Sequence, residues 1–410
     1  MCGILGWIGD VDPKDKYFIL ENGNLRGRDG FGFWRPSGVK RGFTLTSEIK
    51  EWVVDGRIVV GNFRATPTTE AESKDSLLQP YDGFVHNGII ANDKDFADCP
   101  IDSMVLPIIF KDRSFSQIVP NLSKIKGSYA LAYWHNGLIL ACNYKPIYFI
   151  RKEKGFMFAS IPEMLPDFSV PMKPYSAMKI WSDMTIERID LPRYQNNKVL
   201  VSASAGLDST TVAWMLKNQG YEVTLVHFKY GCLAEGKEID RIHRIADAGG
   251  FDLRVIDMPR GVMNGTLTNG DYHHDQIDGT QYAMDWVSAR NLLMLSILTA
   301  YAETNRFSYI AFGGNLEESG AYPDNEEEFG RRFNAILPYA TQNGVKVELI
   351  QPLSRYMKHE IVKIGAELGV PYDLTWSCYS DLDYPCGNCG PCFMRKKAFE
   401  RSGLKDPVFK

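Results

Sequence analysis

The cysteines of this 410-residue chain are unevenly placed. Cys2 stands at the second position, and four others crowd toward the carboxyl end with the spacing C-x7-C-x2-C-x2-C. Four thiolates at such short spacing favour a tetrahedral structural Zn²⁺ site, in which protein ligands fill every coordination position. An iron–sulfur cluster is the alternative, because C-x2-C-x2-C also occurs in that class. The predicted metal ligands are Cys378, Cys386, Cys389 and Cys392.

Cys2 gains a second property if Met1 is removed. Its thiol then lies beside its own α-amine, which titrates at about 7.7–8.0 and can act as a general base. By itself, a cysteine at position two can occur by chance. The polar motifs that follow it favour a functional role.

These motifs occur in a fixed order along the first 105 residues. Arg26–Gly32 is a charged, glycine-rich turn, and Arg64 offers a guanidinium that suits a carboxylate. Asn87 and Gly88 pair a side-chain amide with a glycine N–H, as an oxyanion hole requires. Asp102 supplies a carboxylate for a substrate ammonium. Singly, each is more simply a turn, a surface arginine or a helix cap, but together they favour an active site.

A second loop is suited to phosphate. Ser204–Ser209 joins an apolar strand to a helix, and its small residues let backbone N–H groups approach an anion at the helix N-terminus. It is not the Gly-x-x-x-x-Gly-Lys-Ser/Thr loop of other nucleotide-binding proteins. Ala205 would be strained if its position requires a positive φ.

Two different sequence patterns, one in each half of the chain, predict the elements that position these residues. Residues 1–170 are rich in short apolar strands between Gly, Asn and Asp turns, and Asp190–Asn197 is a polar connector. After it, strands alternate with helices, including strand Lys198–Ser202 and a long apolar helix predicted over Ala283–Thr304. This alternation predicts a doubly wound parallel sheet, with its site at the carboxyl ends of the strands. The predicted domains are 1–190 and 191–410.

The composition is that of an ordinary globular protein, with 44% apolar and 23% charged residues. No apolar run reaches membrane-spanning length, and the amino-terminal residues lack the features of a signal peptide. We therefore expect a cytoplasmic protein without a membrane partner. The net charge of −4 gives no general attraction to nucleic acid.

Residues 1 to about 150 resemble the class II glutamine amidotransferase domain shared by asparagine synthetase and glucosamine-6-phosphate synthase. That family opens with Cys-Gly-Ile, as Cys2–Ile4 does, and its Arg-Gly-x-Asp loop matches Arg26–Asp29. The resemblance implies an αββα sandwich of the N-terminal-nucleophile type and glutamine hydrolysis through a thioester on Cys2. It implies catalytic roles for Cys2, Asn87 and Gly88, and glutamine binding by Arg64, Asp102 and Arg26.

The Ser204–Ser209 loop resembles the pyrophosphate loop, Ser-Gly-Gly-x-Asp-Ser, of the ATP pyrophosphatases, an adenine nucleotide alpha hydrolase-like class. These enzymes adenylate a substrate and release pyrophosphate. The resemblance implies that Asp208 helps to bind Mg²⁺ with ATP and that Lys358 is a second phosphate ligand. The implied ATP-binding residues are Ser204, Ala205, Gly206, Leu207, Asp208, Ser209 and Lys358.

The half from Lys198 to Lys410 resembles the 7-cyano-7-deazaguanine synthase family over its whole length, so the complete chain resembles a Gat-QueC type fusion. That family adenylates 7-carboxy-7-deazaguanine, forms its amide with ammonia, and dehydrates the amide to the nitrile with a second ATP. Asn325 stands where the family usually has cysteine. Asp324 or a close neighbour is expected to accept the adjacent N–H donors of the guanine-like edge. The expected base-binding residues are Arg290, Asn291, Tyr322 and Asp324.

Other outcomes stay open at this point. Glutaminase-fused members also resemble an archaeosine-type enzyme that converts 7-cyano-7-deazaguanine in tRNA or DNA to the formamidino form. Related forms occur in phage DNA modification and bacterial defence, where a ligase to a protein amine or a degenerate binding module is a further alternative. The intact glutaminase residues argue against these last two, because neither needs glutamine hydrolysis. The acidic charge favours a free base over nucleic acid. We expect glutamine, ATP and a 7-deazaguanine as small-molecule partners, and a homodimer.

Overall fold

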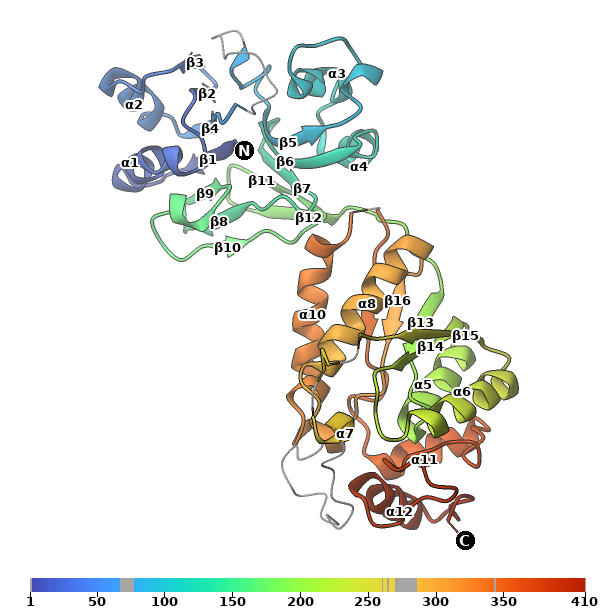
Figure 1. The fold of residues 1–410 in the computed structure, drawn as a ribbon. Coiled ribbons are helices and arrows are strands. Elements are labelled where there is room, and N and C mark those ends of the chain that lie inside the picture. The colour runs from blue at the N-terminus through green and yellow to red at the C-terminus, as the bar shows by residue number, and fades with distance from the viewer. Residues whose placement is uncertain are drawn as a thin grey trace. The chain divides into compact units, whose positions relative to one another are not determined.

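The computed structural model describes residues 2–66, 77–259, 261–263, 265–269, 286–342 and 344–409. The chain divides into two compact units, Met1–Pro192 and Arg193–Lys410, which are considered separately here. Figure 1 traces both units from the amino to the carboxyl terminus.

Unit 1 contains two antiparallel sheets. The seven-stranded sheet has the order β10-β8-β9-β1-β4-β2-β3, and the five-stranded sheet has the order β12-β11-β7-β6-β5. The strands of the first sheet are β1 (Gly3–Gly9), β2 (Phe31–Arg35), β3 (Gly38–Gly42), β4 (Ile58–Phe63), β8 (Tyr148–Arg151), β9 (Gly155–Ala159) and β10 (Val170–Pro171). Those of the second are β5 (Val85–Ile90), β6 (Gly127–Trp134), β7 (Leu138–Cys142), β11 (Ser176–Ile180) and β12 (Ile186–Asp190).

Side-chain alternation along the strands stacks these sheets into four layers. In β1, Ile4 and Ile8 enter the core between the sheets, whereas Leu5 and Trp7 face the opposite side. That outer side is covered by α1 (Pro13–Glu21) and α2 (Ser47–Val54). The second sheet repeats the pattern, with its outer face packed against α3 (Leu106–Ile109) and α4 (Ile118–Leu122). The αββα sandwich predicted from the sequence is confirmed.

Unit 2 is built on a five-stranded parallel sheet with the order β15-β14-β13-β16-β17. In the central strand, Val199 and Val201 pack on one face and Leu200 on the other. Figure 1 shows helices on both faces, as a doubly wound sheet requires. The strands are β13 (Lys198–Ser202), β14 (Glu222–Lys229), β15 (Asp252–Asp257), β16 (Tyr309–Ala311) and β17 (Glu348–Ile350). The helices are α5 (Leu207–Asn218), α6 (Glu235–Gly249), α7 (Thr266–Asn269), α8 (Arg290–Asn305), α9 (Leu316–Ser319), α10 (Glu327–Ala340), α11 (Lys358–Glu367) and α12 (Gly390–Ser402).

The sequence-based helix over Ala283–Thr304 begins too early. Helix α8 starts at Arg290, and residues 283–285 lie outside the described part of the chain. Val287 instead pairs with Gly265 in an antiparallel bridge, and Ala289 takes a left-handed backbone with φ of 50°. A left-handed residue cannot continue a right-handed helix, so the tertiary pairing sets the start of α8.

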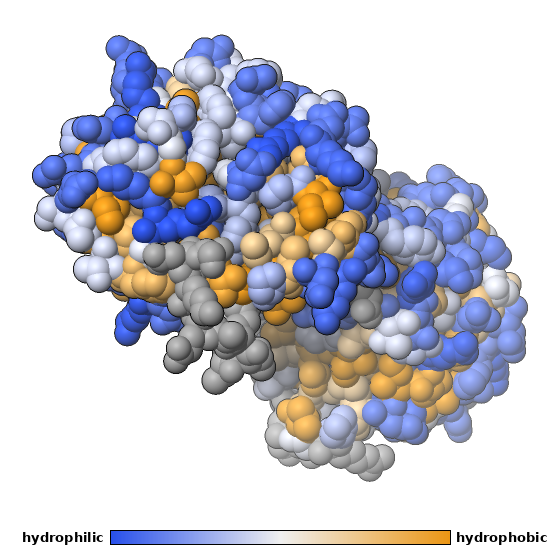
Figure 2. Space-filling model, turned by 90° about the horizontal axis from the view of Figure 1, so that it is seen from above, coloured by the Kyte–Doolittle hydropathy of each residue, from blue (hydrophilic) through white to orange (hydrophobic). Residues whose placement is uncertain are grey.

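Among the described residues, no helix is long and apolar enough to cross a membrane. On the face drawn in Figure 2, apolar side chains form separate patches among polar ones.

A fully buried arginine fastens the end of unit 2. Arg395 of α12 is 2% exposed and donates to both carboxylate oxygens of Asp406, at 2.8 and 3.0 Å. It also donates to Thr375 Oγ1 at 2.7 Å and to the carbonyl of Tyr372 at 2.9 Å. Because its donors are paired with charge and carbonyl oxygens, burial of this guanidinium is compensated.

Removing Arg395 should therefore destabilise unit 2 selectively. We expect Arg395→Ala to lower its unfolding free energy by about 3–5 kcal/mol, because Asp406 becomes a buried charge without its counter-ion. Hydrogen-exchange mass spectrometry of the full chain in increasing urea resolves the two units. The control Arg401→Ala, at an exposed position of the same helix, should change stability by less than about 0.5 kcal/mol. Equal stability of both variants would contradict this role.

Candidate functional sites

Cys2 lies immediately before β1, a strand in the interior of the seven-stranded sheet of unit 1. Its Sγ is 3.8 Å from the carbonyl oxygen of Ala65, just beyond β4. Strands β1 and β5 are in contact, and Figure 1 shows the amino terminus beside β5, which carries Asn87 and Gly88. The thiol is half-buried at this end of the sandwich.

The charged loop from Arg26 is fixed to the end of β4 by backbone bonds. Arg64 donates its N–H to Gly30 at 2.8 Å and accepts from the N–H of Asp29 at 2.9 Å. Gly27 lies so close that a Cβ there would meet the carbonyl oxygen of Phe63 at 2.3 Å, which only glycine avoids. Arg64 is 3% exposed. The loop thus brings Arg26 and Arg64 to the Cys2 end of β1.

Several buried polar atoms on or beside β1, β4 and β5 have no hydrogen-bond partner among the described residues. Asn87 is 1% exposed, yet both its Oδ1 and its Nδ2 are unsatisfied. Arg26 Nε and Asn62 Nδ2 are also unsatisfied; Asn62 pairs with Ile4 across the sheet, and Arg26 packs against Gly3. An unpaired buried polar group costs about 1–3 kcal/mol, so a cluster of them marks a place prepared for a polar ligand.

The backbone around Asn87 is held rigidly. The His86 N–H donates to Gln79 Oε1 at 2.6 Å, and Gln79 Nε2 donates to the His86 carbonyl at 3.0 Å. His86 Nδ1 lies 2.7 Å from Ser103 Oγ, and burial lowers the pKa of this imidazole. Gly88 has φ of 157°, and a Cβ there would meet the carbonyl oxygen of Ser128 at 1.9 Å. The Asn87–Gly88 pair therefore sits on a fixed support.

Asp102 lies beside the same strand. Its Oδ2 accepts from the Ile90 N–H at 2.6 Å, and its Oδ1 accepts from the Ser103 N–H at 2.6 Å and the Ser103 hydroxyl at 3.0 Å, which leaves a further lone pair on Oδ2. Tyr81 connects it to the other candidates: burial raises the pKa of Tyr81, Arg64 lowers it, and Asp102 and Cys2 raise it. Arg64, Asp102 and Cys2 thus all lie within electrostatic reach of one tyrosine.

In unit 2, the Ser204–Ser209 loop follows the central strand β13 and leads into α5. Gly206 is the N-cap residue and no side chain caps the helix, so its first N–H groups are available to an anion. Ala205 is fully buried with φ of 60°, and its carbonyl accepts from the Trp376 N–H at 2.9 Å. The position usually held by glycine is left-handed here, and Ala205 bears that strain.

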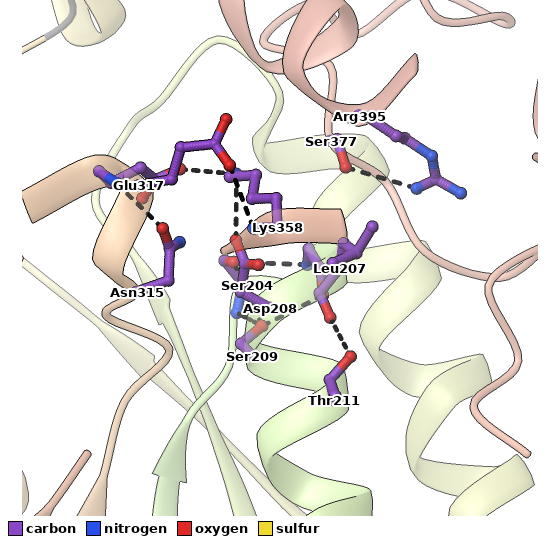
Figure 3. A network of polar contacts seen from close by, with 12 residues as sticks. Ser204, Leu207, Asp208, Ser209, Thr211, Asn315, Glu317, Lys358, Ser377 and Arg395 are labelled. Atoms are coloured by element: carbon purple, nitrogen blue, oxygen red, sulfur yellow. Dashed lines mark hydrogen bonds and ion pairs between the residues drawn. The ribbon is translucent and has the colours of Figure 1, made fainter. Parts of the chain in front are cut away.

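Lys358, the first residue of α11, is held among three acidic side chains (Figure 3). Its Nζ lies 3.2 Å from Asp208 Oδ2 and 2.6 Å from Glu318 Oε1, and its backbone N–H donates to Glu317 Oε2 at 3.1 Å. Burial lowers the pKa of Lys358, but Asp208 and Glu318 outweigh it and raise the pKa overall. Burial raises the pKa of Asp208 to about 6. The cluster thus sets three carboxyl groups against one ammonium, and oxygen ligands of this kind suit a divalent cation.

A polar cavity of about 220 Å³ joins this loop to the start of α8. It lies where the chain reverses direction across the sheet, between β13 and β16, as ligand sites of doubly wound sheets do. Its described lining includes Arg290 and Asn291, but Ala205, Tyr322 and Asp324 are not part of it. From the ATP-binding set it contains Ser204, Gly206, Leu207, Asp208, Ser209 and Lys358.

Asp324 lies behind Arg290 and Asn291. Burial raises the pKa of this carboxyl, while the Arg290 guanidinium and hydrogen bonds with Asn291 lower it. Tyr322 stacks on Trp286 with ring centroids 6.4 Å apart. Both residues therefore support the N-terminal end of α8 on the side of the expected base site.

The four carboxyl-terminal cysteines converge at the start of α12. Their ligand atoms all lie within 4.8 Å of one another, and two Sγ–Sγ distances are 4.0 Å. A tetrahedral Zn²⁺ with bonds of about 2.3 Å needs Sγ–Sγ distances of about 3.8 Å. Backbone N–H groups point at these sulfurs, as from Cys386 to Cys378 Sγ at 3.2 Å, which favours thiolates. Cys378, Cys386, Cys389 and Cys392 can hold a metal ion together.

Three residues of these sites escaped the sequence analysis. Tyr81, Glu238 and Glu318 belong to no recognisable motif, and their partners are distant in sequence. Of the three, only Glu318 carried a signal: it stands in the acidic pair Glu317–Glu318 of α9, the first helix after strand β16.

Comparison with known proteins supplies the family. The model of queuosine biosynthesis protein QueC matches residues 198–403. The 7-cyano-7-deazaguanine synthase 2 of Sulfurisphaera tokodaii is 38% identical over 95% of this chain and 94% of its own. The synthase of Saccharolobus solfataricus is 38% identical over 100% of this chain and 99% of its own. That of Methanothrix thermoacetophila, 38% identical, matches 50% of this chain with 95% of its own.

The family model thus covers half of the chain, and relatives of nearly the same length align with both units. This chain belongs to the 7-cyano-7-deazaguanine synthase family of carbon–nitrogen bond-forming enzymes.

Proposed function

We propose that the protein is a glutamine-dependent, ATP-using amidotransferase that converts 7-carboxy-7-deazaguanine to its amide and then to 7-cyano-7-deazaguanine. The observation that carries the glutamine dependence is the pair of unsatisfied buried atoms on Asn87, in strand β5, which contacts the strand that follows Cys2. A structural asparagine would have its amide satisfied, whereas an oxyanion donor needs a free N–H.

In unit 1, the Cys2 thiolate attacks the carboxamide of glutamine after its proton passes to the α-amine freed by removal of Met1. Asn87 Nδ2 and the Gly88 N–H stabilise the oxyanion of the tetrahedral intermediate. Arg64 and Arg26 bind the substrate carboxylate, and Asp102 binds its ammonium. Ammonia leaves, and water hydrolyses the Cys2 thioester to glutamate.

In unit 2, the carboxylate of the base attacks the α-phosphate of ATP, and pyrophosphate departs into the loop of Ser204–Ser209 at the N-terminus of α5. The surplus of carboxyl groups around Lys358 supports a role for Mg²⁺, which Asp208 would help to hold, in bringing ATP to this loop. Ammonia then displaces AMP to give the amide, and a second ATP drives its dehydration.

The names of the two full-length relatives support the nitrile as the product. Incubation with glutamine, ATP and 7-carboxy-7-deazaguanine, followed by mass spectrometry, tests this directly. We expect 7-cyano-7-deazaguanine. A formamidino product in tRNA or DNA, or a deazaguanine joined to a protein amine, would instead identify one of the alternative acceptors.

Separating the two activities gives the first test. Cys2→Ala should abolish turnover with glutamine but retain turnover with an ammonium salt, because the thiol acts only in ammonia release. Steady-state kinetics with each nitrogen donor measure this. Cys99→Ser, which alters another half-buried thiol of unit 1, should leave both activities unchanged. If Cys2→Ala lost both, the assignment of Cys2 to the glutaminase alone would be wrong.

The ATP site can be tested through its cation. Lys358→Met should reduce ATP consumption by at least about 100-fold, because Asp208 and Glu318 would then repel the phosphates without compensation. Basal glutaminase activity should persist, and Lys363→Met, at an exposed position of α11, should be nearly neutral. Wild-type products should be AMP and pyrophosphate, and ADP with phosphate as the main products would sink the pyrophosphate-loop mechanism.

The metal is tested by elemental analysis. We propose one structural Zn²⁺ per chain, because four converging thiolates leave no open coordination position. Cys389→Ser should lower both zinc content and the thermal stability of unit 2, since a structural metal contributes folding free energy. Cys99→Ser should retain the zinc. Stoichiometric iron with visible absorbance would assign the site to an iron–sulfur cluster instead.

A further inference from the structure

The cavity of unit 2 contains a carboxylate that the proposed chemistry does not use. Glu238 lies in the first turn of α6 and lines the same cavity as the Ser204–Ser209 loop and Arg290. Burial raises its pKa to about 8, while the Arg290 guanidinium and the Cys232 thiol act in the opposite direction. Burial disfavours the ionised form, which hydrogen bonds from a ligand's N–H donors would restore, and groups of this kind concentrate at ligand sites.

The other carboxylates around the cavity are already engaged. Asp208 and Glu318 bind Lys358, Asp324 is hydrogen-bonded with Asn291, and Glu235 accepts the Gly231 N–H at 2.7 Å. Within the described residues, Glu238 makes no ion pair and accepts no backbone N–H, and its hydrogen bond is with the Cys232 thiol, a weak donor. It is therefore the carboxylate of the cavity lining that is available to N–H donors of a ligand.

Arg290 carries the opposite charge to Glu238, and its position in the fold is energetically unfavourable. As the first residue of α8, it puts a cation at the positive end of the helix dipole, directly after Ala289 with its left-handed φ of 50°. Its Nη1 donates to the Tyr230 hydroxyl at 3.2 Å, which leaves further N–H groups of the fork. Backbone strain and an unfavourable charge position in one place indicate a binding function rather than a stabilising one.

The two groups match one edge of a bicyclic base. A 2-amino-4-oxo pyrimidine ring presents two adjacent N–H donors, which a carboxylate accepts as a bidentate pair, followed by an oxo acceptor suited to a guanidinium. This one edge of the base can therefore pair with Glu238 and Arg290 at the same time. Bound in this way, the base lies in the cavity that also contains the phosphate loop.

We propose that Glu238 is the specificity-determining residue for the base: it accepts the ring N–H and the 2-amino N–H, while Arg290 donates to the 4-oxo group. This inference rests on the proposed function, since it defines how that same site selects a 7-deazaguanine. Asp324 then has a supporting part, fixing Asn291 and balancing the charge of Arg290.

The experiment compares 7-carboxy-7-deazaguanine with its analogue lacking the 2-amino group, in the wild type, Glu238→Gln and Glu235→Gln. The wild type should prefer the complete base by at least about 100-fold in kcat/KM, because the analogue leaves the carboxylate without its donor. Glu238→Gln should lose at least about 30-fold with the complete base and little with the analogue, so that the preference falls below about 10-fold. Glu235→Gln, on the same turn but outside the cavity lining, should retain the wild-type preference.

The KM for ATP should remain unchanged in Glu238→Gln, which serves as the check on folding. If ATP binding is lost as well, calorimetric titration of Glu238→Ala with the two bases takes its place, with the same loss of preference expected. A variant that binds ATP and still distinguishes the two bases as the wild type does would overturn the role of Glu238. Failure of the wild type to use any 7-deazaguanine would overturn the proposed function itself, and the two failures are therefore distinguishable.

Discussion

The central strand β13 is the constraint on which unit 2 depends. It is hydrogen-bonded in parallel on both sides, to β14 and β16, and both of its faces are buried. The loop that leaves it can only pass over the carboxyl edge of the sheet, where the connections on the two sides diverge. That geometry brings the uncapped N-terminus of α5 and the glycines after β16 to one cavity. The loop of the proposed ATP site is thus placed by this strand.

In unit 1, an antiparallel sheet fixes the candidate site residues in the same way. Cys2 precedes an interior strand, so its position is fixed by pairing with β4 on one side and β9 on the other. The groups around it come from loops that are fastened to these strands through backbone bonds, as Asp29 and Gly30 are to Arg64. The proposed nucleophile thereby acquires the rigidity of a sheet, which catalysis by preorganised donors requires.

How far the sequence predicts this molecule depends on the distance over which each signal acts. The cysteine spacing and the Ser204–Ser209 loop are local, and both were recognised because a few adjacent residues contain the whole pattern. The predicted start of α8 was wrong because the bridge between Val287 and Gly265 overrides helical propensity. Glu238 and Tyr81 were missed because their surroundings are assembled from remote segments. The left-handed backbone of Ala205 was foreseen only as a condition, since φ is set by the loop and not by its own side chain.

The ion pair between Lys358 and Asp208 also has a consequence for biosynthesis. The two residues are 150 positions apart, so a ribosome adding about 5–20 residues per second makes the carboxylate about 8–30 s before its ammonium. The ion pair can therefore form only after most of the chain has been made, and it cannot stabilise the loop after β13 earlier in synthesis.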